Sequence, residues 1–197
     1  KFLLALHSSA SRALKSVVMG NQTSLTSKQL EEMKGLSNFS TEEVQKLFKR
    51  FKSLDKDHSG GLDLEKFQAI PNLENNPLVR RVVDTFDDDK NGVVDFTEFI
   101  KNLSIFASKS TDSKDEEKTK FAFRMYDVNN DGYISNGDLF KILKIMVGNN
   151  LTDIQLQQLV DRTILQGDKD KDGKLSYVEF VGMVKSSNIG EKLSVEV

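Results

Sequence analysis

The chain has 197 residues, with 28 Lys and Arg against 30 Asp and Glu, so its formal net charge is −2 and a nucleic-acid binder driven by excess positive charge is excluded. It contains no cysteine, which excludes disulfides and thiolate-bound metals and suits a reducing compartment. No run of 18 apolar residues predicts a membrane span, and 13 phenylalanines, many at helical spacing, favour a helical chain.

The first segment, residues 1–36, is predicted to be an N-terminal extension. Its residues 19–24, MGNQTS, fit the N-myristoylation pattern M-G-x-x-x-[ST], with Gly20 as the acceptor. Gly20 can be acylated only if translation starts at Met19, which we favour as the native start. Alternatively, the basic residues 1–18 are a targeting presequence or an amphipathic helix. One myristoyl chain anchors weakly, so we expect a cytoplasmic protein with at most peripheral membrane contact.

Further along, a repeated skeleton organises the chain. It has acidic or amide residues at positions 1, 3 and 5, with serine at position 5 of the first copy, then glycine at position 6 and an aliphatic residue at position 8. The four copies begin at Asp55, Asp87, Asp127 and Asp168, and each lies between segments with helical apolar periodicity. Each unit therefore fits a helix, a twelve-residue loop and a second helix.

The loops carry the ligand pattern of a calcium site. Calcium takes six to eight oxygens, which such a loop supplies from positions 1, 3, 5, 7, 9 and 12, with a backbone carbonyl at position 7. The second and fourth loops match D-x-[DN]-x-[DN]-G-x5-E throughout. Their expected ligands are Asp87, Asp89, Asn91, Val93, Asp95 and Glu98, and Asp168, Asp170, Asp172, Lys174, Ser176 and Glu179.

The third loop departs from this pattern at its last position. Aspartate, one methylene shorter than glutamate, stands where the bidentate ligand is expected. We therefore expect weakened calcium binding and less discrimination against magnesium, which prefers fewer ligands. The expected ligands are Asp127, Asn129, Asp131, Tyr133 through its carbonyl, Ser135 and Asp138.

The first loop departs further, because Lys66 stands at position 12. A protonated lysine cannot donate an electron pair, and its charge repels a metal ion. We expect this loop to bind calcium weakly or to stay empty, and the alternative is an occupied loop with the lysine swung outward. The total is then three to four calcium sites. The remaining ligands of this loop are Asp55, Asp57, Ser59, Gly61 through its carbonyl and Asp63.

These features predict an all-α fold of four EF-hands in two paired lobes. The residues at position 8, Leu62 with Val94 and Ile134 with Leu175, are expected to join the paired loops through short β contacts. A polar stretch after the second unit indicates a linker or the polar start of the next helix. The expected divisions are 1–36, the extension; 37–106, the N-terminal pair; 107–117, the linker; 118–186, the C-terminal pair; and 187–197, the tail.

Three stretches, residues 76–100, 121–140 and 142–164, resemble the calcineurin B family, and the resemblance extends roughly over residues 38–197. It implies a non-catalytic regulatory subunit of the calcium- and calmodulin-dependent serine/threonine phosphatase. Such a protein forms a heterodimer by gripping an apolar helix of the catalytic partner, calcineurin A, and confers calcium sensitivity. The chain departs from the family at Lys66 and Asp138, where glutamate is usual.

The resemblance also implies a second contact surface after the third unit, for substrate docking motifs and immunophilin–drug complexes. The residues that match this surface are Met146, Val147, Asn149, Asn150 and Leu151. They also read as a helix end, at which Gly148 stops the helix and Leu151 packs down.

A sensor that regulates a kinase or ion exchanger is the alternative function, and a pure calcium buffer is a third. No catalytic set is found, so an enzyme is least favoured.

Overall fold

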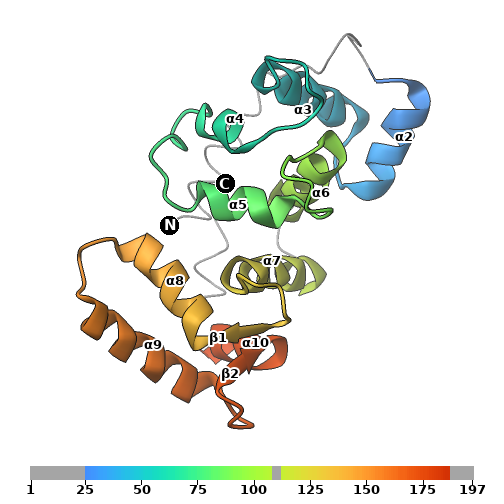
Figure 1. Ribbon diagram of the computed structural model, residues 1–197. Coiled ribbons are helices and arrows are strands. Elements are labelled where there is room, and N and C mark those ends of the chain that lie inside the picture. The colour runs from blue at the N-terminus through green and yellow to red at the C-terminus, as the bar shows by residue number, and fades with distance from the viewer. Residues whose placement is uncertain (1–24, 108–111, 187–197) are drawn as a thin grey trace. The chain divides into compact units, whose positions relative to one another are not determined.

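The computed structural model describes residues 25–107 and 112–186, with side chains described for residues 25–107 and 115–185. Gly20 and the rest of residues 1–24 lie outside these ranges. The elements in chain order, drawn in Figure 1, are α2 (Ser27–Leu36), α3 (Thr41–Leu54), α4 (Leu64–Gln68), α5 (Val79–Phe86), α6 (Phe96–Ala107), α7 (Asp112–Tyr126), β1 (Tyr133–Ser135), α8 (Asn136–Val147), α9 (Asp153–Gly167), β2 (Lys174–Ser176) and α10 (Tyr177–Ser186).

The predicted helical class with short β contacts is confirmed. In the C-terminal unit β1 pairs antiparallel with β2, and Ile134 faces Leu175 in the register. In the N-terminal unit Leu62 and Val94 form an isolated antiparallel bridge, with both N–H···O distances at 2.9 Å. In the described ranges no helix is both long enough and apolar enough to cross a bilayer.

Edge-to-face aromatic packing forms the core of the N-terminal unit. The Phe48 and Phe96 rings lie 5.0 Å apart, Phe51 and Phe96 5.5 Å, and Phe67 and Phe86 6.1 Å. These rings come from the helices before and after both loops, so the core fixes where each loop begins and ends.

Helix α2 adds a contact that the sequence pattern does not predict. It packs on α3 and α6, and Met33 is buried there. Thr26 begins the helix through a capping box: its Oγ1 accepts from the Gln29 N–H at 3.3 Å, and its own N–H donates to Gln29 Oε1 at 2.9 Å. The pair Thr26 and Gln29 is the sequence signal for this helix.

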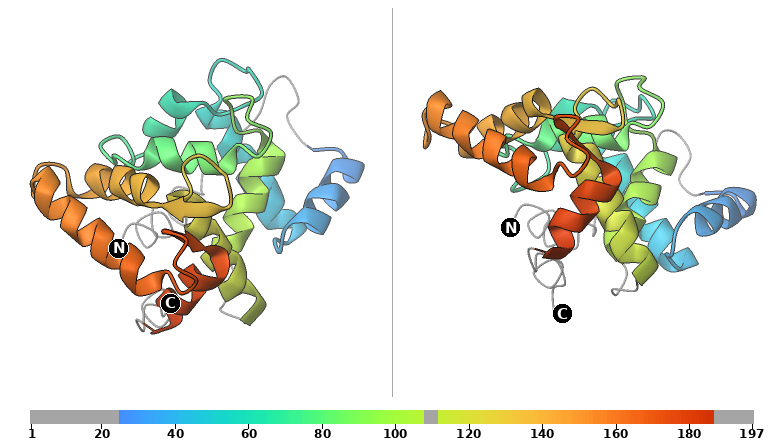
Figure 2. Two further views of the ribbon diagram at one scale, coloured as in Figure 1. Left: turned by 60° about the horizontal axis from the view of Figure 1, so that its bottom comes forward. Right: turned by 90° about the horizontal axis from the view of Figure 1, so that it is seen from below.

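The core of the C-terminal unit gathers around its two-stranded sheet. Figures 1 and 2 show α8 and α9 side by side, in agreement with their contacts. Two apolar residues that continue the helical apolar periodicity around the fourth loop are exposed, Leu159 at 44% and Val178 at 78%. Residues 112–117 of the expected linker form the first turns of α7. The buried cluster is Phe123, Ile134, Leu139, Val160, Ile164 and Leu175.

Candidate metal centre

The first three loops share one backbone frame. In loop two the N–H of Gly92 donates to Asp87 Oδ2 at 2.9 Å, and the N–H of Asn91 donates to Asp87 Oδ1 at 3.2 Å and Asp89 Oδ1 at 3.1 Å. Gly92 has a φ of 90°, a left-handed conformation that glycine adopts without strain. Loops one and three repeat the three bonds within about 0.2 Å, so positions 1 to 6 fold alike.

Loop two closes through Glu98, the glutamate at its position 12. Its Oε1 accepts from the N–H of Asp88 at 2.8 Å, and its Oε2 accepts from the N–H of Asp95 at 2.9 Å. Glu98 is 8% exposed and Asp87 is 5% exposed. A carboxylate held this way reaches back across the loop toward position 1, as a bidentate calcium ligand must.

Loop four closes in the same way through Glu179. Its Oε1 accepts from the N–H of Lys169 at 2.6 Å, and its Oε2 accepts from the hydroxyl of Ser176 at 2.7 Å and the N–H of Ser176 at 2.8 Å. The Lys169 N–H bond, followed by the Ser176 bonds, lowers the pKa of Glu179 to about 2. The carboxylate is therefore ionised across the physiological range and available to a cation.

The carboxylates of loops two and four converge into clusters that fit calcium. Ligand oxygens from positions 1, 3 and 12 lie within 4.8 Å of one another in each loop. Three like charges this close repel one another, and a hard divalent cation between them removes that repulsion. The two clusters are Asp87, Asp89 and Glu98, and Asp168, Asp170 and Glu179.

Loop three keeps the frame but not the closure. The Oδ2 of Asp138 accepts from the hydroxyl of Ser135 at 2.5 Å and from its N–H at 3.2 Å. Glu98 and Glu179 also bond position 9, so this contact is common to the three loops. Position 3 of loop three is Asn129, and among the described residues no third cluster of three converging carboxylates forms here. The N–H of Tyr133 lowers the pKa of Asp131, which keeps this ligand ionised. The site is partly assembled rather than absent.

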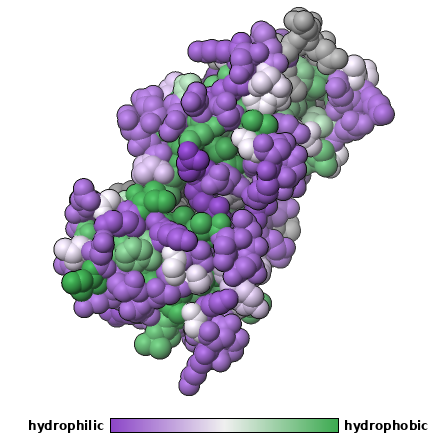
Figure 3. Space-filling model, viewed as in Figure 1, coloured by the Kyte–Doolittle hydropathy of each residue, from purple (hydrophilic) through white to green (hydrophobic). Residues whose placement is uncertain are grey.

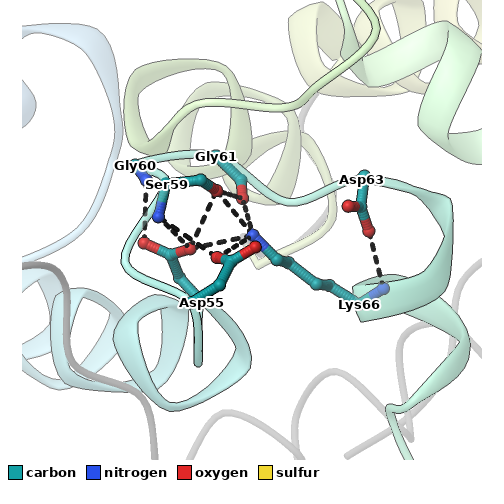
Figure 4. Close-up of polar contacts among 7 residues, drawn as sticks. Asp55, Ser59, Gly60, Gly61, Asp63 and Lys66 are labelled. Atoms are coloured by element: carbon teal, nitrogen blue, oxygen red, sulfur yellow. Dashed lines mark hydrogen bonds and ion pairs between the residues drawn. The ribbon is translucent and has the colours of Figure 1, made fainter.

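Loop one contains a built-in cation. The ammonium nitrogen of Lys66 lies 2.9 Å from Asp55 Oδ1, 2.5 Å from Asp57 Oδ1 and 2.6 Å from Ser59 Oγ. Figure 4 shows the lysine side chain pointing into the loop, toward Asp55, Ser59 and Gly61. It lies 2.9 Å from the carbonyl oxygen of Gly61. These four oxygens belong to positions 1, 3, 5 and 7, the same positions that supply ligands in a calcium loop.

Burial and charge around this lysine are matched. Its side chain is 12% exposed and that of Asp55 is fully buried. Burial by itself lowers the pKa of Lys66, but hydrogen bonds to Asp57 and Asp55 outweigh it and raise the pKa above its usual value. The Lys66 bond, as the largest influence, holds the pKa of Asp57 well below its usual range. The ion pair is therefore intact at neutral pH.

The remaining predicted ligand of loop one has a different task. The Oδ1 of Asp63 accepts from the backbone N–H of Lys66 at 2.9 Å and so caps α4, while Glu65 is exposed to solvent. The sequence predicts a lysine that repels an ion or swings outward. The structure shows a third arrangement, in which the ammonium fills the loop. The four-carbon side chain at position 12 is the sequence signal for it.

The predicted contact surface lies at the end of α8. Gly148 ends the helix with a φ of 57°, and its N–H donates to the carbonyl of Lys144 at 2.9 Å. Met146 is 48% exposed, Asn149 and Asn150 are exposed, and Leu151 is half-buried. The segment is thus both a helix end and an accessible surface.

Comparison with known proteins assigns the family. A sequence model of the EF-hand domain pair matches residues 44–104 and 116–185. The chain is 52% identical over 179 residues to the type 1 calcineurin B protein of Dictyostelium discoideum, covering 90% of this chain and 98% of the relative. It is 51% identical over 175 residues to the type 2 calcineurin B protein of Homo sapiens, covering 89% and 98%. The chain therefore belongs to the calcineurin B family of calcium-binding, non-catalytic regulatory subunits.

Proposed function

We propose that this chain binds an apolar helix of a calcineurin catalytic subunit and thereby makes the phosphatase sensitive to calcium. The observation that carries the proposal is the near end-to-end similarity to calcineurin B proteins, about half identical over 90% of this chain. Loops two and four supply the calcium dependence, because their converging carboxylates need a cation. Neutralising those charges reorients the flanking helices, which changes the apolar surface that they present.

Calcium fills loops two and four first in this account. Loop three follows more weakly, since Asp138 bonds Ser135 at position 9, whereas Glu98 and Glu179 bond position 9 with one oxygen and position 2, across the loop, with the other. A site with fewer ligand oxygens tolerates magnesium, so loop three is the position at which the two metals compete. The chain thus takes calcium at three loops, with loop one outside the count.

Exposed apolar side chains of the C-terminal unit support partner binding. Figure 3 shows apolar surface among hydrophilic side chains on the face that it presents. Such side chains project from α8 and the adjacent α9, where contact with water is unfavourable for them. An amphipathic helix of a partner buries side chains of this kind. The exposed fractions are Ile145 40%, Met146 48%, Ile154 73%, Leu159 44% and Leu165 81%.

The end of α8 is proposed as a second docking surface on the assembled enzyme. The exposed Met146, Asn149 and Asn150 offer one apolar and two amide side chains next to the turn at Gly148. Substrate docking motifs and immunophilin–drug complexes are the partners that we assign to it, together with the half-buried Leu151 and Val147. A mixed apolar and amide surface suits extended peptides that need both burial and hydrogen bonds.

Lipidation is a separate part of the proposal. In a chain that starts at Met19, Gly20 becomes the N-terminal residue after methionine removal and accepts a myristoyl group. Expression from Met19 with a myristate analogue should label the wild-type chain and leave Gly20→Ala unlabelled. Label on Gly20→Ala, or none on the wild type, contradicts this part alone.

The experiment for the main proposal is reconstitution, at saturating calmodulin, with a calcineurin catalytic subunit. We expect a stable complex whose phosphatase activity rises with calcium, and a weaker calcium response for Glu98→Gln and Glu179→Gln. Glu74→Gln, an exposed carboxylate outside the four loops, is the matched control and should behave as wild type. Failure to bind the catalytic subunit, with capture of a kinase or an ion exchanger from the source cell, rejects the proposal in favour of the alternative sensor.

A further inference from the structure

Loop one has the geometry of a cation site whose cation is part of the chain. Its frame reproduces that of loop two: the N–H of Gly60 donates to Asp55 Oδ2 at 2.9 Å, as Gly92 donates to Asp87. His58 and Gly60 have φ values of 59° and 90°, against 61° and 90° at the equivalent positions of loop two. The loop is therefore fully formed, and its difference from loop two lies at position 12.

We propose that the Lys66 ammonium is the resident cation of loop one, so that this hand stays folded at every calcium level and takes no calcium. The inference deepens the proposed function and rests on it for the roles of the other three loops. Four oxygens lie within 2.9 Å of the ammonium nitrogen and share its three hydrogens. The fully buried Asp55 carboxylate has its counter-charge at hand without any ion from solvent.

A calcium ion cannot compete well for this place. It has to expel a tethered ammonium, and a tethered group acts at an effective concentration of about millimolar or above. The expelled lysine then loses its carboxylate partners, while the ion gains no bidentate glutamate in exchange, because Glu65 is exposed rather than turned into the loop. Both effects favour the lysine over calcium at the micromolar levels to which sensor loops respond.

For regulation, the N-terminal lobe then has one loop that does not change with calcium and one loop that responds to it. Loop one is bonded to loop two through the Leu62 and Val94 bridge, with both N–H···O distances at 2.9 Å. In an ordinary pair, filling of one loop helps the other; here the neighbour of loop two is already in place before calcium arrives. Loop two therefore titrates as a single site on a preformed support.

The test counts calcium ions on the full-length chain and follows the glycine amides at position 6. Equilibrium dialysis compares the wild type with Lys66→Glu, which restores glutamate at position 12. We expect Lys66→Glu to bind one more calcium ion per chain, with a Kd of about 10 µM or tighter, in the sensor range. Lys56→Glu, an equal charge change at an exposed position of the same loop, should add none.

The second readout needs no variant. In chelator, the Gly60 amide of the wild type should exchange slowly, and calcium should move the Gly92 and Gly173 resonances by much more than that of Gly60. Lys66→Gln should raise the Gly60 exchange rate in chelator about tenfold or more, since Asp55 loses its counter-charge. A wild-type Gly60 that exchanges freely without calcium and becomes protected on adding it overturns the inference.

The outcomes separate this inference from the function on which it rests. An unchanged calcium count in folded Lys66→Glu, with the other loops occupied, contradicts the lysine's role and leaves the proposed function standing. A wild-type chain that binds no calcium at all contradicts the proposed function instead. An extra ion on Lys56→Glu as well as on Lys66→Glu shows a general charge effect and also counts against the lysine.

Discussion

Loops one and two of the same lobe have the same backbone and opposite endings. In loop two Glu98 brings a negative charge back to the ligands at positions 1 and 3, so three carboxylates converge and need a cation from solvent. In loop one Lys66 brings a positive charge to the same place. Positions 1 to 6 therefore specify the shape of the loop, whereas position 12 decides whether the cation comes from solvent or from the chain.

Glu98→Gln is the change expected to have the largest effect on this comparison. It keeps the shape of the side chain but removes the charge that draws calcium into loop two. We expect the affinity of loop two for calcium to fall about 100-fold, equivalent to about 2.7 kcal/mol. A calcium titration that follows the Gly92 amide measures it, and Gly173 in the C-terminal unit serves as the internal control. An unchanged midpoint at Gly92 contradicts the role given to position 12.

Lys66→Met tests how much the lysine stabilises loop one when a chelator removes calcium. Removing one partner of a buried ion pair costs about 3–5 kcal/mol, and the 12% exposure of Lys66 lowers our expectation to about 2 kcal/mol. Hydrogen exchange at the Leu62 amide reports it, because that group pairs with Val94 across the lobe. Lys28→Met is the control, since its ion pair with Glu32 lies at an 88% exposed side chain and should contribute almost nothing. Equal stability of Lys66→Met and wild type in chelator would mean that the ammonium is not structural.

Asp138→Glu extends the comparison to loop three. The added methylene should let one carboxylate oxygen reach back toward position 1 while the other keeps its bonds to Ser135, as Glu179 does with Ser176 in loop four. We expect calcium affinity at this loop to rise about tenfold, or about 1.4 kcal/mol, and competition by magnesium to weaken. Calcium titrations with and without magnesium, followed at the Gly132 amide, measure both effects. No change in either quantity would show that the shorter side chain already closes the loop.

The smallest effect is expected from pH on the metal-free C-terminal unit. The pKa of Glu179 is about 2 in the fold against an ordinary value of 4.5, so its ionised form stabilises the fold above about pH 4.5. That contribution fades as pH falls from about 4.5 through about 2. Ser176→Ala removes one hydrogen bond to the carboxylate and so raises the pKa of Glu179 in the fold; the loss should therefore be smaller and should end at a higher pH. The three tyrosines, Tyr126, Tyr133 and Tyr177, all lie in this unit, so their fluorescence follows it selectively; identical pH profiles of variant and wild type contradict the assignment.

Sequence periodicity is sufficient to predict the helical class and the paired loops. The spacing of phenylalanines and the aliphatic residue at position 8 identify the buried faces and the bridges at Leu62 with Val94 and Ile134 with Leu175. These features follow from local sequence patterns, because the backbone geometry of a helix or loop places residues at fixed spacings on the same side. The exposure of Leu159 and Val178 cannot be predicted in this way, because a helical apolar face does not reveal which of its residues a partner covers.

The direction of two side chains is beyond the sequence. The reach of Lys66 depends on whether four methylenes bring its nitrogen to Asp55 or to solvent, and only the folded loop decides between them. Whether the shorter Asp138 bonds position 9, as Glu179 does, is likewise decided only in the folded loop, and the structure shows its Oδ2 bonded to Ser135. The packing of α2 on α3 and α6 is hard to predict because its cap signal, Thr26 with Gln29, is short and lies in a polar extension.

The most direct measurement is the anomalous scattering of calcium from crystals grown at saturating calcium. We expect strong anomalous peaks enclosed by Asp87 with Glu98 and by Asp168 with Glu179. We expect no peak inside the first loop, with the Lys66 nitrogen still within hydrogen-bond distance of the Asp55 carboxylate. A calcium peak between Asp55 and Asp57 with the lysine displaced into solvent would contradict it.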